Sequence, residues 1–363
     1  LTEKALRYDL TVPFARYVAQ YQNDIIFPFK RYQIQPVWRA DRPQKGRFQE
    51  FYQCDADVVG SKSLWQEIEF IQLYDAVFSD LNLNGVTIKI NNRKILAGIA
   101  ELIGAQDKLI DFTVALDKLD KIGAEKVKEE MLNKGIDSDG ISKLEPLFSL
   151  TGDFSEQLQS LRTILSASTE GIKGVEELEF IASSVAAIGL KTAKLQMDVT
   201  LARGLNYYTG AIFEVSAPDS VQMGSIGGGG RYDDLTGIFG LKDVSGVGIS
   251  FGLDRIYLVL EELNLFPFDK TTSTKVLFTN FGTSESLYCL KAMTILRSKS
   301  IATELYPDPA KLKKQMVYCN KREIPYVVMV GEAEMAQNKF MLKDMNSGDQ
   351  QLITLDELIK IVS

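Results

Sequence analysis

The sequence predicts an α+β fold, in which an antiparallel sheet is interrupted by a helical segment and followed by a separate α/β domain. Three observations lead to this prediction. Apolar and polar residues alternate with the period of a strand in segments before residue 92 and again after residue 192. The residues between them follow a helical period. Beyond residue 273, short strand and helix patterns alternate, which is typical of a compact α/β domain.

A strand, a basic loop and a returning strand occupy residues 32–60. The first strand ends at Arg39, the loop spans residues 42–47, and the second strand is the segment FQEFYQCDADVV. An arginine at this place suits ATP, because its planar fork can bond phosphate oxygens in pairs, and Phe51 on the returning strand can cover a base. A solvated basic turn has the same composition, so the loop alone leaves both interpretations open.

The elements that follow are predicted from local patterns. A capping box at Ser63 opens a helix that extends to about Leu83. A strand over residues 86–91 and a helix over residues 93–104 come next. Residues 106–191 are helical throughout, with faces rich in lysine and glutamate. Strand patterns then resume in the segments LQMDVTLA, GAIFEVSA, SIGGGGRYDDL and GVGIS.

The C-terminal part of the chain follows the run FPFDKTTST, whose composition is typical of a linker. Its patterns are a strand KVLFTNF, a helix over residues 284–298, a strand TELYP, a helix over residues 310–322 and a strand YVVMVG. The expected domain boundaries follow from this order. They are residues 1–105 and 192–266 for the sheet domain, 106–191 for a helical insertion and 273–363 for the α/β domain.

Composition excludes several kinds of chemistry. The 363 residues carry a net charge of −7 and include no histidine, which rules out histidine general bases, Ser-His or Cys-His nucleophiles and histidine-ligated metals within this sequence. The three cysteines lack metal-binding spacing, so we expect reduced thiols and no protein metal site. No apolar run is long enough to span a membrane. The remaining polar side chains suit charge stabilisation in phosphate chemistry.

Two further features leave alternatives open. The run GSIGGGGRYDD lacks the GK[ST] ending of a P-loop, so its glycines serve either backbone packing or the close approach of a ligand. Two basic clusters are either solvated surfaces or contacts for nucleic acid. One comprises Lys30, Arg31, Arg39, Arg42, Lys45 and Arg47, and the other Lys311, Lys313, Lys314, Lys321 and Arg322.

Three segments together resemble the histidyl-tRNA synthetase family of class II aminoacyl-tRNA synthetases. The hairpin of residues 32–60 resembles class II motif 2, with Arg39 as its arginine. GISFGLDR resembles motif 3, which ends at Arg255, and RGLNYYTG resembles the signature specific to histidine. The resemblance extends over essentially the whole chain. It implies a class II antiparallel-sheet catalytic domain with a helical insertion, and a C-terminal α/β domain that binds the anticodon.

The resemblance implies a ligase that works in two steps. Histidine and ATP form histidyl-adenylate and pyrophosphate, and histidine then passes to the 3′ end of its tRNA. Arg39 would hold the α-phosphate, and Arg47 and Arg255 the outer phosphates, with magnesium expected on the phosphates of ATP. Phe51 would stack on adenine, and Asp41 would help to position the base.

The family match also assigns the residues that select histidine. Arg203 would contact the attacking carboxylate and the α-phosphate, while Asp57 and Tyr208 would address the imidazole ring, with Tyr207 beside them. Taken singly, an acid on a strand is more often solvated and a tyrosine pair more often part of a core. Asp55 shares the face of Asp57, so parity leaves two candidates, and the family match favours Asp57. The α-ammonium would be held by Asp9, Thr11 and Gln53.

The resemblance also implies which partners the protein binds and which part of the family's sequence precedes this chain. We expect L-histidine, ATP and histidine tRNA as partners, and a cytoplasmic homodimer without membrane association. The chain opens on LTEKALRYDLTVPF, past the place of motif 1, and is expected to lack its first few dozen residues. Asn206 stands where the family commonly has Asp. Two alternatives share the fold: the histidine-binding regulatory paralogue of ATP phosphoribosyltransferase, which usually loses the catalytic arginines, and a tRNA-sensing module of a kinase.

Overall fold

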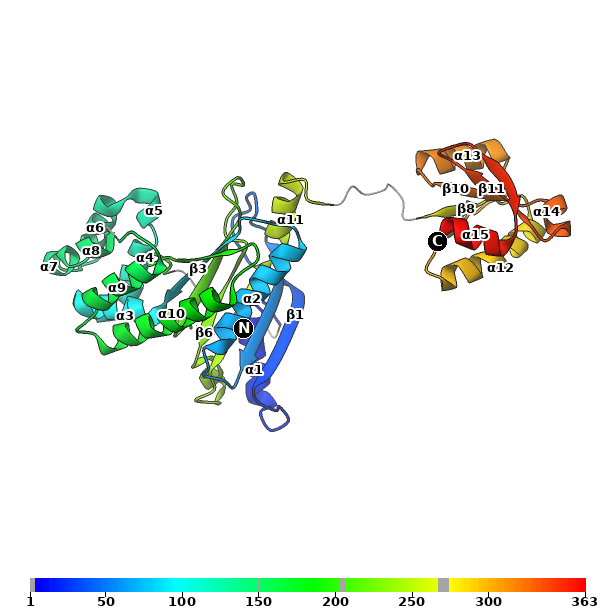
Figure 1. Ribbon diagram of the computed structural model, residues 1–363. Helices are drawn as coiled ribbons and strands as arrows, with labels where there is room; N and C mark the ends of the chain where they lie inside the picture. The colour runs from blue at the N-terminus through cyan, green and yellow to red at the C-terminus, as the bar shows by residue number, and fades with distance from the viewer. Residues whose placement is uncertain (1–3, 149, 203–206, 267–273) are drawn as a thin grey trace. The chain divides into compact units, whose positions relative to one another are not determined.

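The computed structural model describes residues 4–148, 150–202, 207–266 and 274–363. The chain divides into two compact units, Leu1–Leu265 and Phe266–Ser363 (Figure 1). Each unit has hydrophobic cores of its own. Within the described residues, no helix is both long and apolar enough to cross a membrane. All three cysteines are free thiols, as their spacing predicted.

Unit 1 is built on a seven-stranded sheet with the order β1-β2-β7-β6-β5-β3-β4. Neighbouring strands are antiparallel except for β3 and β4, which are parallel. The predicted α+β fold with a mainly antiparallel sheet is therefore confirmed. The strands are β1 (Phe29–Trp38), β2 (Glu50–Val59), β3 (Thr87–Asn92), β4 (Lys194–Met197), β5 (Ala211–Ser216), β6 (Gly227–Tyr232) and β7 (Gly246–Gly252).

Helix α2 (Trp65–Asp80) covers one face of this sheet (Figure 1). Its Ile71 and Phe78 are fully buried in the main core. Tyr74 packs edge-on against Phe251 of β7, with ring centroids 4.8 Å apart. Because side chains alternate between the two faces of a strand, this packing leaves the neighbours of Phe251 on the opposite face.

The capping box expected at Ser63 is wrong. Helix α2 begins at Trp65 and its N-cap, Leu64, offers no capping side chain. The hydroxyl of Ser63 accepts a long hydrogen bond of 3.4 Å from the N–H of Trp65, and Oε1 of Gln66 has no partner in the described part of the chain, so no reciprocal box forms. The carbonyl of Ser63 instead accepts a hydrogen bond of 3.0 Å from Arg231, whose buried guanidinium needs acceptors. Arg231 also donates two bonds to Glu67, at 2.5 and 2.6 Å. This buried pair fixes the start of α2 on the sheet.

Three short helices of unit 1 were not predicted from the sequence. They are α1 (Thr11–Gln20), the 3₁₀ helix η2 (Leu235–Phe239) and α11 (Leu253–Glu262). A small core that includes Phe14 and Leu235 joins α1 to η2. Since this core also contains Tyr232 of β6, the two helices close one end of the sheet face that α2 leaves open.

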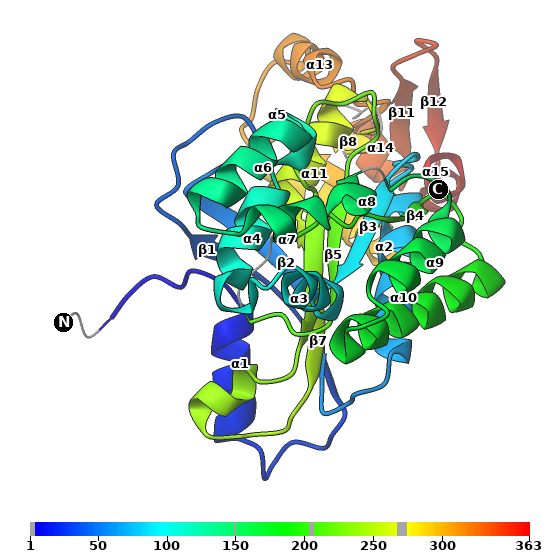
Figure 2. The same cartoon turned by 90° about the vertical axis from the view of Figure 1, so that its left-hand side faces the viewer.

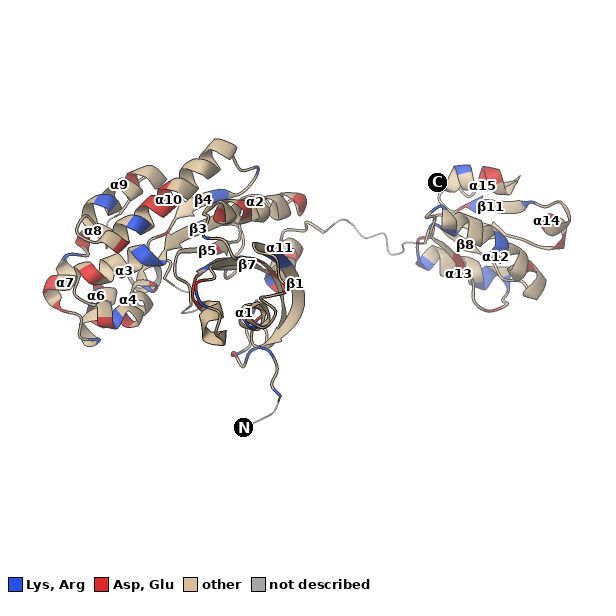
Figure 3. Ribbon diagram, turned by 90° about the horizontal axis from the view of Figure 1, so that it is seen from below, with Lys and Arg blue, Asp and Glu red and all other residues tan. Residues whose placement is uncertain are grey.

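The residues expected to form a helical insertion contain a series of short helices, separated by turns, between residues 106 and 188. They form η1 (Gln106–Lys108), α4 (Leu109–Leu116), α5 (Leu119–Ile122), α6 (Ala124–Asn133), α7 (Ser138–Ser142), α8 (Glu145–Phe148), α9 (Phe154–Ile164) and α10 (Thr169–Ile188). Helices α9 and α10 run side by side, and charges of both signs are interspersed over them (Figures 2 and 3). Their apolar residues continue the core of the sheet, so the boundaries of a separate insertion domain stay a prediction.

Helix α3 (Arg93–Leu102) lies against α10 at very short range because glycines face each other there. A Cβ built on Gly98 would lie 2.6 Å from the Cα of Gly171. A Cβ on Gly174 would lie 2.8 Å from the backbone nitrogen of Ile95. Larger residues at these places would force the two helices apart, so the glycines hold the helical layer close to β3.

Unit 2 is an α/β domain, as predicted. Its elements are β8 (Val276–Phe278), α12 (Thr283–Ser298), β9 (Thr303–Leu305), α13 (Leu312–Lys321), β10 (Tyr326–Met329), α14 (Glu332–Ala336), β11 (Phe340–Asp344), β12 (Gln350–Ile353) and α15 (Leu355–Val362). The sheet order is β12-β11-β10-β8-β9. Strands β9, β8 and β10 pair in parallel, whereas β11 pairs antiparallel with both β10 and β12. The last four elements were not predicted from the sequence.

Candidate active site

One face of the sheet in unit 1 carries a row of polar side chains. The alternate residues of β2 on this face are Phe51, Gln53, Asp55 and Asp57. The register places Asp55 opposite Ser250 and Asp57 opposite Gly248 on β7, and β6 adds only glycines at these levels. Since glycine has no side chain, the surface beside Asp57 and beyond Ser250 is bare backbone. A small ligand could lie there against the strands.

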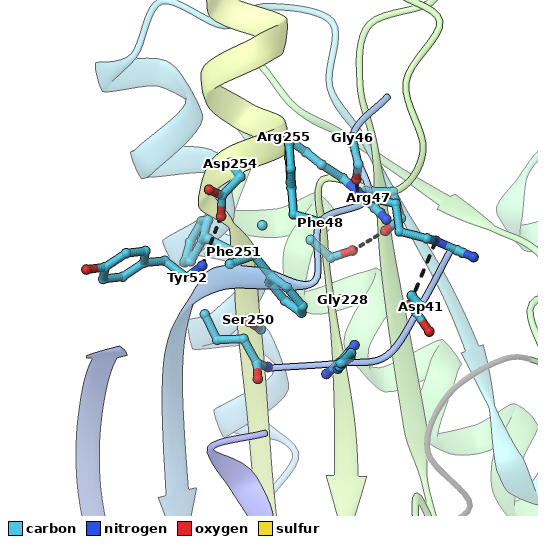
Figure 4. A pocket seen from close by; sticks show the side chains of 16 residues that line it. Asp41, Gly46, Arg47, Phe48, Tyr52, Gly228, Ser250, Phe251, Asp254 and Arg255 are labelled. Carbon is cyan, nitrogen blue, oxygen red and sulfur yellow. Dashed lines mark hydrogen bonds and ion pairs between the residues drawn. The ribbon is translucent and has the colours of Figure 1, made fainter. Parts of the chain in front are cut away.

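A cavity of about 290 Å³ lies at the outer end of this row (Figure 4). It brings together every residue that the resemblance assigned to ATP: Arg39, Asp41, Arg47, Phe51 and Arg255. The side chains come from the hairpin of β1 and β2 and from the start of α11. Three arginines around one hollow suit a polyanionic ligand.

The guanidinium of Arg39 lies between two aromatic rings. Its central carbon is 4.5 Å from the ring centroid of Tyr8 and 5.0 Å from that of Phe51. Its Nε also donates to the carbonyl of Tyr8 at 3.2 Å. These contacts restrict the orientation of Arg39, so less rotamer freedom would be lost when it binds an anion.

The loop between β1 and β2 is held by Arg255. Gln44 and Arg47 exchange backbone hydrogen bonds of 3.2 and 2.9 Å across the turn, and Gly46 within it has φ +71. That backbone conformation favours glycine. Arg255 donates to the carbonyl of Gly46 at 2.5 Å and to that of Ser225 at 2.6 Å. Burial and the neighbouring Arg47 lower the pKa of Arg255, but a guanidinium keeps its charge at neutral pH.

Asp41 and Arg47 face each other at the mouth of the cavity (Figure 4). Their closest atoms, Oδ2 and Nε, are 3.9 Å apart, and both side chains are 45% exposed. An ion pair of this kind adds little stability because water screens it. Both side chains can therefore exchange this contact for contacts to a ligand.

A second, narrower cavity continues inward along β2. It has a volume of about 40 Å³ and shares Gln53, Gly228 and Ser250 with the outer cavity. Most of the residues that the resemblance assigned to histidine line it: Thr11, Gln53, Asp57, Tyr207 and Tyr208, together with Asp55. The two cavities therefore adjoin on one face of the sheet.

Asp57 has a neighbour at each of its oxygens, an ion pair at Oδ2 and a hydrogen bond at Oδ1, although Oδ2 has no hydrogen-bond partner among the described residues. Its Oδ2 lies 2.9 Å from Nη2 of Arg31, which faces it across the β1–β2 register, and its Oδ1 accepts a hydrogen bond of 2.7 Å from the hydroxyl of Tyr232. Burial raises the pKa of Asp57 to about 6, against the opposing effects of Arg31 and Tyr232. A Cβ on Gly248 would lie only 2.0 Å from Oδ1, so this position requires glycine.

Asp55 has a different environment from Asp57. Its carboxylate is buried beside Ser250, and its Oδ1 has no hydrogen-bond partner among the described residues. Burial raises the pKa of Asp55 to about 7; a hydrogen bond with Ser250 opposes this shift, and the charge of Asp57 adds to it. The two acids that parity could not separate thus differ in their partners.

The structure places Asp9 outside the narrow cavity. It lines an adjacent hollow with Tyr8 and Tyr207, and its Oδ1 accepts a hydrogen bond of 3.2 Å from the N–H of Val12. Burial raises its pKa. The rings of Tyr207 and Tyr208 pack edge-on with centroids 4.9 Å apart, and Tyr207 contacts both hollows.

Arg203 and Asn206 lie outside the described residues, so the structure adds nothing to their assignment. The glycine run does lie within them, as strand β6. A Cβ on Gly229 would lie 2.2 Å from the carbonyl oxygen of Gly248, while Gly228 lines both cavities. The glycines therefore permit close packing of the strands, while the close approach of a ligand stays a prediction, with Gly228 at the floor of both cavities.

The comparison with known proteins agrees with the motifs. A family model described as histidyl-tRNA synthetase matches residues 3–256, and one described as an anticodon binding domain matches residues 275–363. The chain belongs to the histidyl-tRNA synthetase family. It combines this synthetase domain with the C-terminal anticodon binding domain that unit 2 forms.

Individual relatives cover nearly the whole chain. A protein named histidine–tRNA ligase from Christiangramia forsetii is 68% identical over 358 residues, which are 99% of this chain and 78% of that protein. One from Flavobacterium johnsoniae is 66% identical over 360 residues, or 99% and 76% of the two chains. A crystal structure of histidyl-tRNA synthetase from a Nostoc species is 33% identical, with a TM-score of 0.84, and covers 98% of this chain and 83% of that one.

Sequence reasoning missed two side chains that contact Asp57. Arg31 was noted only as part of a basic cluster, and Tyr232 was not considered. The alternation of β1 carried a signal for Arg31, because it shares a face with Gln33 and Gln35, two residues apart. The sequence carried no signal for Tyr232, since its contact with Asp57 depends on the packing of strands that are far apart in the sequence.

Proposed function

We propose that the chain is a histidine–tRNA ligase, which activates L-histidine with ATP and transfers it to the 3′ end of histidine tRNA. One observation carries this proposal: an arginine-lined cavity and an acidic cavity adjoin on one sheet face and share Gln53, Gly228 and Ser250. Such a site can bring the carboxylate of a cationic amino acid to the α-phosphate of ATP. Membership of the family and the names of relatives at 52–68% identity support it.

The first step joins two anions. A carboxylate oxygen of histidine attacks the α-phosphorus, and the bond from that phosphorus to the pyrophosphate oxygen breaks. No base is needed, because the attacking carboxylate is already deprotonated, which accords with a chain that lacks histidine. The protein must offset the repulsion with fixed cations. We assign the α-phosphate to Arg39, the outer phosphates to Arg47 and Arg255, and adenine to Phe51 and Asp41.

The inner cavity would select the amino acid. Asp57, Tyr208 and Tyr207 are assigned to the imidazole ring, and Asp9, Thr11 and Gln53 to the α-ammonium. The position of Asp9 in the adjacent hollow requires that the ammonium point toward α1 (Thr11–Gln20). Arg203 keeps its assignment to the carboxylate and the α-phosphate from the motif match alone.

Magnesium would reach the site with ATP. In the described parts of the chain, no three acids or cysteines are grouped so that they could hold a metal ion. A magnesium ion bound mainly by phosphate oxygens needs only one or two protein carboxylates, so the residues present suit a magnesium–ATP complex as substrate. When bound, the ion would supply additional positive charge to the phosphates.

The second step, transfer of histidine to its tRNA, requires that the protein bind the tRNA, and we assign part of that binding to unit 2. We infer that this unit binds the anticodon end of the tRNA, and that exposed lysines of α13 contribute phosphate contacts. Replacing Lys313 and Lys314 by glutamate should weaken tRNA binding and reduce its salt dependence, while adenylate formation stays unchanged. If the affinity for tRNA stays unchanged, these lysines do not contact the tRNA and are only solvated surface residues. From the class II resemblance we also infer a homodimer that acts in the cytoplasm.

ATP–pyrophosphate exchange tests the proposed function. Each amino acid is supplied in turn with the protein and magnesium–ATP, and exchange is expected with histidine alone. The regulatory paralogue would bind histidine without exchange. The likeness to a solved structure from Bacillus halodurans, described as an ATP phosphoribosyltransferase regulatory subunit/histidyl-tRNA synthetase, is one of fold, at 22% identity and a TM-score of 0.68.

A further inference from the structure

Asp55 is a buried acid without a cationic partner. It is 3% exposed, and its Oδ1 lacks a hydrogen-bond partner within the described part of the chain. The ion pairs found in that part include Asp57 but not Asp55. Burying an unpaired carboxylate is costly, and the side chain lines the inner cavity rather than a packed core. This combination indicates a site where a ligand supplies the missing donor.

The walls around Asp55 carry an excess of acid. Asp57 adjoins it on β2, and Asp9 approaches from the segment before α1; the cation on β1 that faces this pair, Arg31, is already bound to Asp57. The other polar groups that line the cavity are hydroxyls and an amide, which carry no charge at neutral pH. They belong to Thr11, Gln53, Tyr207, Tyr208, Tyr232 and Ser250.

We propose that the ring of histidine binds here as an imidazolium, with Asp55 accepting a hydrogen bond from one ring N–H and Asp57 from the other. The proposal rests on the proposed function, which makes histidine the occupant. A neutral ring has one donor and one acceptor, whereas an imidazolium has two donors. Two carboxylates on one face match two donors. The Cα atoms of residues i and i+2 of a strand are about 6.7 Å apart, so side chains that extend in parallel from Asp55 and Asp57 can flank a ring with a hydrogen bond of about 2.8 Å on either side.

The two acids play unequal parts in this arrangement. Asp57 is oriented by Arg31 and Tyr232, so it positions the ring. Asp55 supplies the uncompensated charge that favours the protonated ring. Burial raises the pKa of Asp55 to about 7, so the carboxylate gains stability when a cation arrives. Asparagine and glutamine, whose amides cannot become cations, would leave Asp55 unpaired and are rejected on that ground.

Proton uptake distinguishes this binding mode. At pH 8 the free ring, with a pKa of about 6.5, is mostly neutral, so an imidazolium complex must take a proton from the buffer. Titration calorimetry of histidine binding in two buffers of different ionisation enthalpy measures this uptake. The full chain is expected to take up close to one proton for each histidine bound. The variant Asp55→Asn is expected to bind with little uptake.

Two outcomes would overturn the proposal: no proton uptake by the unchanged protein, or the same uptake by Asp55→Asn. Any change in protonation of the α-amino group of histidine is the same for the unchanged protein and for Asp55→Asn, so it cancels when the two proton uptakes are compared. Failure of histidine to support exchange would instead count against the proposed function. Histidine that supports exchange but binds without proton uptake would count against this inference alone.

A ring analogue provides a test that needs no variant. Triazolylalanine has a similar shape, but its ring is far less basic and stays neutral near pH 7. It is expected to bind the unchanged protein more weakly than histidine by about tenfold or more, the effect of one pKa unit or more. In Asp55→Asn this difference should shrink. Equal affinity of the two ligands for the unchanged protein would contradict the proposal.

Discussion

The two ends of strand β2 (Glu50–Val59) differ in charge and in exposure to water. At the outer end, Phe51 lies among Arg39, Arg47 and Arg255 in a cavity open to solvent. At the inner end, Asp55 and Asp57 are each 3% exposed in a narrow cavity. One strand can carry both environments because it runs from the rim of the sheet face into the enclosed part beside α1.

The difference shows how depth changes the role of a side chain. An arginine at the outer end keeps donors for a ligand, since water screens its pairing, as in the 3.9 Å contact of Arg47 with Asp41. Arg31 at the inner end is 9% exposed and is bound to Asp57 at 2.9 Å. Its charge serves to hold an acid in place. Changes at the outer end should therefore affect ATP, and changes at the inner end histidine.

The largest effect is expected from Arg39→Ala at the outer end. Loss of one preorganised donor to the α-phosphate should lower the rate of pyrophosphate exchange by about 10²–10³, or about 3–4 kcal/mol. Histidine affinity, measured by calorimetry without ATP, should stay the same. Arg42→Ala, an exposed residue of the same loop, is the matched control and should exchange normally. Exchange by Arg39→Ala within threefold of the unchanged protein would refute the assignment.

At the inner end, Tyr232→Phe should weaken histidine binding and leave ATP binding unchanged. The variant loses the 2.7 Å bond to Asp57, and hydrogen bonds to charged groups contribute about 1.5–3 kcal/mol. Because that bond lowers the pKa of Asp57, the pKa should rise above about 6. Isothermal titrations with histidine and with an ATP analogue measure both effects. Tyr17→Phe, on the exposed side of α1, is the control. A weakened ATP affinity would break the separation of the two ends.

Gly248→Ala should also act at the inner end. The added methyl group would meet Oδ1 of Asp57 at 2.0 Å, so the carboxylate must move, and overpacking costs about 1–3 kcal/mol. We expect a lower melting temperature and weaker histidine binding. Gly237→Ala is the matched control, because a Cβ there would meet nothing within 4 Å. Equal stability of the two variants would show that Asp57 can shift at no cost.

The smallest effect concerns stability and pH. The pKa of Asp55 is about 7 in the folded chain, above its ordinary value of 3.8, so its contribution to stability is present below about pH 4 and is lost as the pH rises through 7. Asp55→Asn lacks this dependence. Relative to the unchanged protein, its melting temperature should therefore rise between pH 5 and pH 8, by about 2–4 °C for each kcal/mol. A difference that is constant with pH would mean that Asp55 is not buried as an acid.

Local patterns predicted the polar face of β2 but not its contacts. Alternation was enough to place Gln53, Asp55 and Asp57 together, because the period of a strand is fixed. The partners of Asp57 depend on the hairpin register and on the order β2-β7-β6, which long-range packing decides. The cap at Ser63 was wrong for the same reason, since buried Arg231, far along the chain, binds its carbonyl.

Helix α1 could have been predicted. Pro13 lies in its first turn, where proline is tolerated, and Phe14 and Val18 are spaced by one helical turn on its buried side. The sequence gives a weaker signal for the final strands of unit 2. β11 and β12 are short, and their antiparallel pairing departs from the parallel alternation that precedes them. The order of the sheet therefore had to come from the structure.

Strand β6 (Gly227–Tyr232) also has a consequence for how the sheet assembles. Its four successive glycines bring no apolar surface, and glycine loses more backbone freedom on folding than any other residue. The strand can therefore become ordered only between neighbours that are already in place. In a pulse-labelling hydrogen-exchange experiment during refolding, the amides of β5 that bond to β3 and those of β7 that bond to β2 should gain protection before the amides of β6. The floor on which both substrates are expected to meet would then be the last part of the sheet to form.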